Sequence, residues 1–328
     1  DFSSLSTAPD NLATKLILNA RYYYAPKSSV KIRYSKSKLT QDDDFLPYTA
    51  NLNLLTALPQ ANLNAEVDTS DVTFLLQHWF SSEWSLMAKY RDRERDNKTE
   101  QLLFQPVVTD LYIASQMMMN MPYDFSKRSI ITRLDYHPFA NQLLSLAYSS
   151  DDKTRNYQTI HNTTEDGFTA KYRASLSEDF VLMIKAEQMN RDGSAPEIID
   201  FLSVTENPLM QRYNVSDREQ NKVNFQMIYN PIDNFSTSIS GYFTEQDYKK
   251  TEIGLTDNVQ QNLNINFAWE INKDVNVSLF MEKEKNETDL VGSNNFSSPN
   301  WYANNLDEVN SYGMSLSIKE LMDSKLDI

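Results

Sequence analysis

The sequence predicts an all-β protein, a large transmembrane antiparallel up-and-down β-barrel to which this chain contributes about 14 strands. Three observations predict this fold. Segments of about ten to twelve residues alternate apolar and polar side chains, aromatic residues gather beside tight turns, and tight turns alternate with long polar loops. We therefore expect residues 1–328 to form a single transmembrane barrel domain.

The overall polarity of the chain excludes a helical membrane protein. The mean hydropathy is −0.56, the hydrophobic fraction is 40%, and no run of about 18 apolar residues is present. A transmembrane barrel has the hydropathy of a soluble protein, because only every second residue of each strand faces lipid. The composition is therefore compatible with a barrel.

One unit, two alternating strands joined by a tight turn, recurs about seven times along the chain. Its turns are rich in Pro, Asn, Asp and Ser, the residues that hairpin turns favour. The expected strand pairs are Thr14–Tyr23 with Val30–Leu39, Asp71–Trp79 with Trp84–Arg95, Ser129–Tyr136 with Gln142–Ser150, Gly167–Leu176 with Phe180–Met189, Asn221–Tyr229 with Phe235–Gln246, and Gln260–Trp269 with Val275–Glu284, after which Val309–Ile318 leads to a turn near Lys319–Ser324.

The alternation predicts a sheet with one apolar and one polar face. Val223, Phe225 and Met227 share one face of their strand, whereas Asn224 and Gln226 occupy the other. A soluble sandwich alternates in the same way, but its strands average about five or six residues. Strands of about ten to twelve residues instead match the nine to eleven that cross a bilayer at a tilt.

Aromatic residues lie where the expected strands meet the tight turns. A ring of Tyr, Trp and Phe at one level is the interfacial girdle of a membrane barrel. The predicted girdle consists of Tyr23, Trp79, Trp84, Tyr136, Phe180, Tyr229, Phe235 and Trp269.

The other ends of the strands are joined by long polar loops, which we expect at Gln41–Thr69, Asn97–Phe125, Gly193–Ser216 and Asp289–Asp307. Short periplasmic turns with longer outer loops are typical of bacterial outer-membrane barrels. The first ten residues hold no apolar signal region, and the last four enter a strand. Because an open edge must be closed, we expect the domain to be incomplete, with an N-terminal part and closing strands missing from this chain.

The charge and the rare residue types exclude several functions. With 31 basic and 45 acidic residues the net charge is −14, which argues against nucleic acid as a partner. Cysteine is absent, so disulfides, thiolate metal sites and covalent haem attachment are excluded for this chain. With three histidines and no catalytic glycine motif, we expect no enzyme and no bound cofactor.

An ordered set of short segments resembles the decahaem-associated outer-membrane barrels of the MtrB/PioB type. The resemblance covers about residues 8–195 and continues more weakly through the later hairpins; no single motif carries it. The segments are Ala8–Asn11, Thr40–Asp43, Tyr90–Arg93, Arg95–Thr99, Pro122–Phe125 with Lys127 and Arg128, Tyr172–Glu178, and Asn190–Ser194.

This resemblance implies a location and a role. Family members form a wide outer-membrane sheath around a periplasmic multihaem cytochrome, with a second multihaem cytochrome docked at the outer surface. The barrel insulates and aligns the haems, which the partner cytochromes carry. Members often have a Cys pair near the N-terminus; this chain has no Cys, which fits the loss of an N-terminal part or a divergent branch.

Five basic residues are candidates for docking a cytochrome. Arg91, Arg93 and Arg95 share one strand face, with acidic residues between them on the other, and Lys171 and Arg173 point inward on a later strand. The alternative for the arginines is a strand end that projects into water, where exposed ion pairs contribute little.

Asp42, Asp43 and Asp44 are candidate Ca²⁺ ligands at the outer surface, because Ca²⁺ prefers carboxylate oxygens. Their spacing differs from that of an EF-hand, and a solvated acidic loop is the alternative reading.

Three functions compete. The first is a sheath for electron transfer through a multihaem c-type cytochrome, with the lipid bilayer and two cytochromes as partners. The second is a general porin or substrate-specific outer-membrane channel. The third, an outer-membrane enzyme, lacks a supporting nucleophile and base motif.

Overall fold

The computed structural model describes residues 9–47, 49, 51–54, 56–197 and 207–319. Thirteen long strands account for most of these residues, and the sequence-predicted hairpins are present. The long strands are β1 (Leu12–Ala25), β2 (Ser28–Gln41), β3 (Ala65–Trp79), β4 (Trp84–Asn97), β9 (Phe125–Tyr136), β10 (Gln142–Arg155), β11 (Asn162–Ser175), β12 (Phe180–Gly193), β14 (Arg218–Ile232), β15 (Phe235–Asp247), β16 (Ile253–Asn272), β17 (Val275–Gly292) and β18 (Trp301–Ile318).

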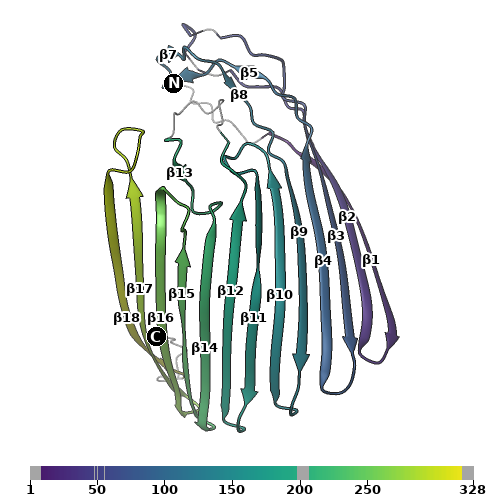
Figure 1. The fold of residues 1–328 in the computed structure, drawn as a ribbon, viewed down its shortest axis with the longest axis vertical. Helices are drawn as coiled ribbons and strands as arrows, with labels where there is room; N and C mark the ends of the chain where they lie inside the picture. Colours follow the sequence, from purple (N-terminus) through teal and green to yellow (C-terminus); the bar gives the residue numbers. More distant parts are fainter. Residues whose placement is uncertain (1–8, 48, 50, 55, 198–206, 320–328) are drawn as a thin grey trace.

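The long strands form one curved antiparallel sheet in which each strand pairs with its neighbours along the chain (Figure 1). This is the predicted up-and-down order. Within the described residues β1 and β18 each have one partner strand, so the sheet is an open arc. Within the described residues, no helix is long and apolar enough to span a membrane.

Short strands occur only in the described parts of the long loops. These are β5 (Leu103–Phe104) with β8 (Met118–Met119), β6 (Val107–Val108) with β7 (Tyr112–Ile113), and β13 (Met210–Gln211), which pairs with β16 in parallel.

Tight turns occupy one end of the sheet and long loops the other (Figure 1). The turn between β1 and β2 is shorter than predicted and consists of Pro26 and Lys27, with Lys27 at a φ of 62°. The predicted long loop Asp289–Asp307 is wrong, because β17 runs to Gly292 and β18 begins at Trp301. The residues there pair with one another as extended strand. The predicted final turn lies largely outside the described residues.

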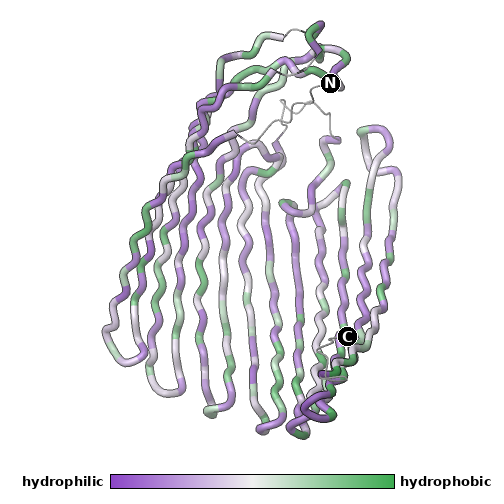
Figure 2. Tube along the Cα trace, turned by 180° about the vertical axis from the view of Figure 1, so that it is seen from behind, coloured by the Kyte–Doolittle hydropathy of each residue, from purple (hydrophilic) through white to green (hydrophobic). Residues whose placement is uncertain are grey.

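Cross-strand register gives the sheet one apolar and one polar face, because directly paired residues point to the same side. On the apolar face, Leu182 pairs with Met227, which pairs with Ile239. On the polar face, Gln226 pairs with Ser240, which pairs with Asn264. The alternation of hydrophilic and hydrophobic residues can be followed along the strands in Figure 2.

Burial distinguishes the two faces further. On the apolar face Leu16, Phe168 and Met281 are 55, 56 and 58% exposed, whereas on the polar face Ser145 and Asn258 are 7 and 5% exposed. Side chains spread apart on the convex side of a curved sheet and crowd together on the concave side. The apolar face is therefore the outer, convex face, a surface that a water-soluble protein would hide.

The apolar part of the outer face forms a band beside the tight turns. On β4 the outward residues are Trp84, Leu86, Ala88 and Tyr90, followed by acidic residues toward the long loops. Neighbouring strands also carry outward apolar residues beside the tight turns, about four on each strand, and continue with polar or charged residues of either sign toward the long loops. Such a band, flanked by charge, is what a strand that crosses a bilayer requires.

Candidate functional site

The polar face carries an excess of positive charge, although the whole chain has a net charge of −14. On the nine long strands from β1 to β14, register places eighteen Lys and Arg but only five Asp and Glu on this face. The basic residues are Lys15, Arg21, Lys31, Arg33, Lys89, Arg91, Arg93, Arg95, Lys127, Arg133, Lys153, Arg155, Lys171, Arg173, Lys185, Arg191, Arg218 and Lys222. We call this part of the polar face the basic wall.

All five carboxylates of the basic wall already have a basic partner. The pairs are Arg91 with Asp71, Lys127 with Asp151 at 2.9 Å, Arg133 with Asp135 at 3.0 Å, Lys185 with Glu187 at 2.8 Å, and Arg218 with Glu165. The other thirteen cations of the wall have no ion pair with any described residue.

The polar face of β15–β18 differs in charge. Its described residues include no Lys or Arg, and its acids are Glu270, Glu282, Glu284 and Asp307. Amide and hydroxyl side chains bond across the strands here: Asn258 Nδ2 donates to Asn286 Oδ1 at 2.9 Å. Most of its side chains are uncharged, and its four carboxylates have no described basic residue beside them on this face; we call this part the neutral wall to set it apart from the basic wall.

A hollow lies on the basic wall across β1–β4. Its volume is about 370 Å³, and its lining consists of Lys15, Lys31, Arg33, Ser35, Asp71, Thr73, Leu75, Lys89 and Arg91. Five cations therefore surround one carboxylate, and that carboxylate is bound by Arg91. The hollow can accept an anionic group.

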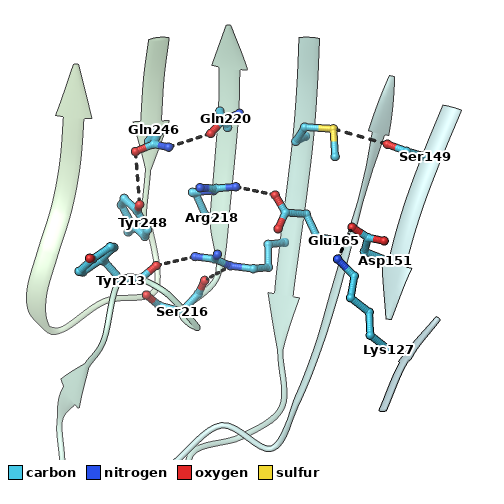
Figure 3. A network of polar contacts seen from close by, with 12 residues as sticks. Lys127, Ser149, Asp151, Glu165, Tyr213, Ser216, Arg218, Gln220, Gln246 and Tyr248 are labelled. Carbon is cyan, nitrogen blue, oxygen red and sulfur yellow. Dashed lines mark hydrogen bonds and ion pairs between the residues drawn. The ribbon is translucent and has the colours of Figure 1, made fainter. Parts of the chain in front are cut away.

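A segment of the loop between β12 and β14 folds against the wall at the end of the strands near the long loops (Figure 3). Arg191, which is 9% exposed, donates from Nε to the carbonyl of Ser216 at 2.8 Å and from Nη2 to that of Tyr213 at 2.6 Å. Lys250, in the turn after β15, binds Asp217 at 2.7 Å, and this hydrogen bond raises the pKa of Lys250. The segment is thus fastened at two points.

The five predicted docking residues all lie on the basic wall. Arg91, Arg93 and Arg95 are half-buried on β4, and Lys171 and Arg173 lie on β11. Strands β9 and β10 separate the two groups, so the structure does not join them into one cluster. Their docking role stays a prediction.

Six of the eight predicted girdle residues lie on the outer face beside the tight turns, and some of their rings touch. Trp84 stacks on Tyr136 with ring centroids 4.4 Å apart, and Phe180 meets Tyr229 at 6.1 Å. The prediction that Tyr23 and Trp79 belong to the outer girdle is wrong, because the register places both on the polar face. In that position Trp79 stacks on His137 at 5.4 Å.

The three predicted Ca²⁺ ligands follow β2 but do not converge on one point. The carboxylate of Asp43 accepts a hydrogen bond from the backbone N–H of Asp10 at 2.6 Å. The backbone of Asp44 forms an isolated β-bridge with that of Asn62. No group of three or more His, Cys, Asp or Glu in the described part of the chain is arranged to hold a metal ion.

Five of the eighteen cations were predicted from the sequence as inward or docking residues, and the basic wall as a whole was not. The signal was present, because the inward position of a charge follows from its parity within a strand. To decide which faces of neighbouring strands form one side of the sheet, the residue-by-residue pairing of the strands is also needed. The sequence alone does not give this register.

Comparisons with known proteins agree with this architecture. A family model described as "Putative outer membrane beta-barrel porin, MtrB/PioB" matches residues 1–328. The outer membrane protein MtrB of Shewanella baltica (strain OS185) is 24% identical over 323 residues, which is 98% of this chain and 46% of that protein. The chain thus spans about half the length of this curated relative.

Solved outer-membrane proteins share the fold. The ferric-catecholate import receptor Fiu from E. coli K12, in its closed form, matches with a TM-score of 0.54 and 10% identity over 94% of this chain and 55% of the receptor. The copper transporter OprC matches with a TM-score of 0.50 and 11% identity over 93% of this chain and 56% of the transporter. At these identities the likeness concerns the fold alone.

Proposed function

Since the chain belongs to the MtrB/PioB family of outer-membrane β-barrels, we propose that it forms part of a sheath that houses and aligns a multihaem c-type cytochrome. The chain is a protein of the bacterial outer membrane. Its apolar band meets the lipid, and its polar face lines the interior. Electrons would cross the membrane along the haems of the enclosed protein, and a second cytochrome would dock at the outer end.

The observation that carries this proposal is the width and chemistry of the inner face. Thirteen long strands form only an open arc, and the matched relative is about twice as long as this chain. Barrels of about 16 to 18 strands already enclose an aqueous channel. A barrel wider than this, lined by side chains that can hydrogen-bond, has room for a folded protein.

In this proposal the haem belongs to the partners, and the barrel has no catalytic role. The chain supplies no cysteine for covalent attachment. Its contributions are to exclude lipid, to bind the protein in the lumen through polar contacts, and to hold that protein in register with the docked outer cytochrome.

Purification of the full-length protein from its own host tests the proposal. We expect a haem protein to remain bound through mild detergent extraction, with the absorbance of c-type haem in the barrel fraction. A barrel that is always isolated without haem, from cells that make multihaem cytochromes, would contradict the sheath.

A porin or substrate-specific channel is the second candidate, favoured by the family description and by the polar inner face. It predicts steady ion conductance through the barrel alone in planar bilayers and no tightly bound protein. The sheath predicts that conductance is low with the haem protein in place and rises once that protein is removed.

A further inference from the structure

We propose that the basic wall is the docking surface for an acidic face of the protein in the lumen, and that the hollow across β1–β4 receives its carboxylates. This inference rests on the proposed sheath function and adds the charge and the orientation of the occupant. It also predicts that the neutral wall faces a less acidic side of the same protein.

The first support is the surplus of cations. Every carboxylate of the basic wall is already paired, and thirteen cations have no ion pair with the described residues. Around the hollow, Lys15, Lys31, Arg33 and Lys89 belong to this unpaired set. These groups are therefore available to carboxylates brought by another molecule.

The second support is repulsion within the wall itself. Like charges that lie directly opposite each other on paired strands destabilise a sheet. The wall has five such pairs, namely Arg21 with Lys31, Arg93 with Lys127, Lys127 with Lys153, Lys171 with Lys185, and Arg191 with Arg218. In four of them one cation already has a carboxylate partner on the wall, whereas the pair of Arg21 and Lys31, which includes a residue of the hollow, has none among the described residues. An acidic occupant would offset this repulsion, whereas an occupant of neutral or basic surface would leave it.

The extent of the wall favours a protein surface over a small anion. A small-molecule site gathers a few polar groups at one point. Here eight of the nine neighbouring long strands carry cations, and these extend along most of the strand length, from Arg173 near the tight turns to Arg95 near the long loops. An extended positive surface is complementary to an extended negative one, and such complementarity fixes orientation.

Two variants of the full-length protein test the docking surface. The first is K15Q/K31Q/R33Q/K89Q, which neutralises the unpaired cations of the hollow. The matched control is S238D/S240D/Q260E/S315D, which changes the charge of the polar face by the same amount on the neutral wall. The charge-conserving variant K31R/K89R checks that the hollow tolerates substitution. Heat-modifiable migration in gels confirms that each variant folds.

The measurement is the haem retained per barrel as the NaCl concentration of the wash is raised. We expect K15Q/K31Q/R33Q/K89Q to bind the haem protein about tenfold more weakly than the wild type and to release it at lower salt. The neutral-wall control and K31R/K89R should behave as the wild type does.

The outcomes separate the two proposals. Equal haem retention by the wild type and the hollow variant would overturn the docking surface and leave the sheath intact. Equal losses in the hollow variant and the neutral-wall control would also overturn it, because the effect would then come from total charge alone. A wild-type barrel that retains no haem at any salt concentration would contradict the sheath itself, and the docking surface with it.

Discussion

Single residues hold the segment of the loop between β12 and β14 that folds against the basic wall near the long loops. Arg191 is nearly buried and binds two carbonyls, those of Ser216 and Tyr213. We expect Arg191→Ala to free this segment and to lower the free energy of unfolding by about 3 kcal/mol, because two hydrogen bonds from a charged donor are lost and each contributes at least about 1.5 kcal/mol. Limited proteolysis of the segment and urea titration of the barrel in vesicles measure the two effects.

Arg191→Lys is the control for this prediction. It keeps the charge but cannot reproduce the two-pronged contact, so we expect an intermediate loss. If Arg191→Ala resisted protease as well as the wild type does, the arginine would not be what holds the segment.

The second anchor, Lys250 with Asp217, gives a pH dependence at high pH only. The hydrogen bond raises the pKa of Lys250 above its ordinary value of about 10.4. A raised lysine pKa means that the contact is complete below the ordinary value and is lost as the pH rises through the higher one. A spin label on Asn214→Cys should keep the same mobility from pH 6 to pH 9 and gain mobility only at more alkaline pH.

Lys250→Met provides the reference for the spin-label experiment. In this variant the label should show, at every pH, the mobility that the otherwise unchanged chain reaches only at alkaline pH, since the contact of Lys250 with Asp217 cannot form while that of Arg191 remains. Mobility that already increases between pH 6 and pH 8 in the otherwise unchanged chain would show that another group controls the segment.

At the scale of the elements, the central feature is the opposite character of the two faces of each strand. On β15, Ile239 lies in the middle of the outward apolar band, and Ser240 points to the neutral wall. We expect Ile239→Lys to lower the free energy of unfolding by about 2–4 kcal/mol, as for lysine at the bilayer midplane. Ser240→Lys should cost less than about 1 kcal/mol, because the amine stays in water.

Urea unfolding of both variants in lipid vesicles provides the comparison. The two substitutions add the same side chain at adjacent positions, so their difference reports the face and not the residue type. Equal losses of stability, or a larger loss for Ser240→Lys, would mean that the faces have been assigned in reverse.

Most strands could be predicted from the sequence, because alternation over a long segment specifies the strand and its two faces. The last two strands show where that signal weakens. Residues such as Asp289 and Asn304 lie above the apolar band, where both faces are polar, so the pattern was taken for a loop. They pair as strand because the ladder of backbone hydrogen bonds continues beyond the band.

The girdle shows a different limit of the sequence. Tyr22, Tyr23 and Tyr24 are consecutive, and an error of one residue moves a side chain to the other face. Tyr22 points outward and is 70% exposed, whereas Tyr23 was predicted. For Trp84 and Tyr136 the prediction of the outer face agrees with the register, since both begin or end a clean alternation.

At the scale of the whole molecule, the two faces divide the charge of the chain. The outer face beyond the apolar band is rich in carboxylates, and the inner face of β1–β14 is rich in cations. Composition alone reports only the total of −14 and conceals this division. The division follows from the register that joins the strands, and it supports the inference about an acidic occupant.

The apolar face of the sheet meets lipid, and the polar face encloses water or protein. Single cysteines from Asn262 to Trp269 on β16, each carrying a fluorophore, test this arrangement directly, because this chain has no native cysteine. In vesicles we expect brominated lipid to quench positions 263, 265 and 267, and aqueous iodide to quench 262, 264 and 266. Equal quenching at odd and even positions, or the reverse pattern, would contradict the account.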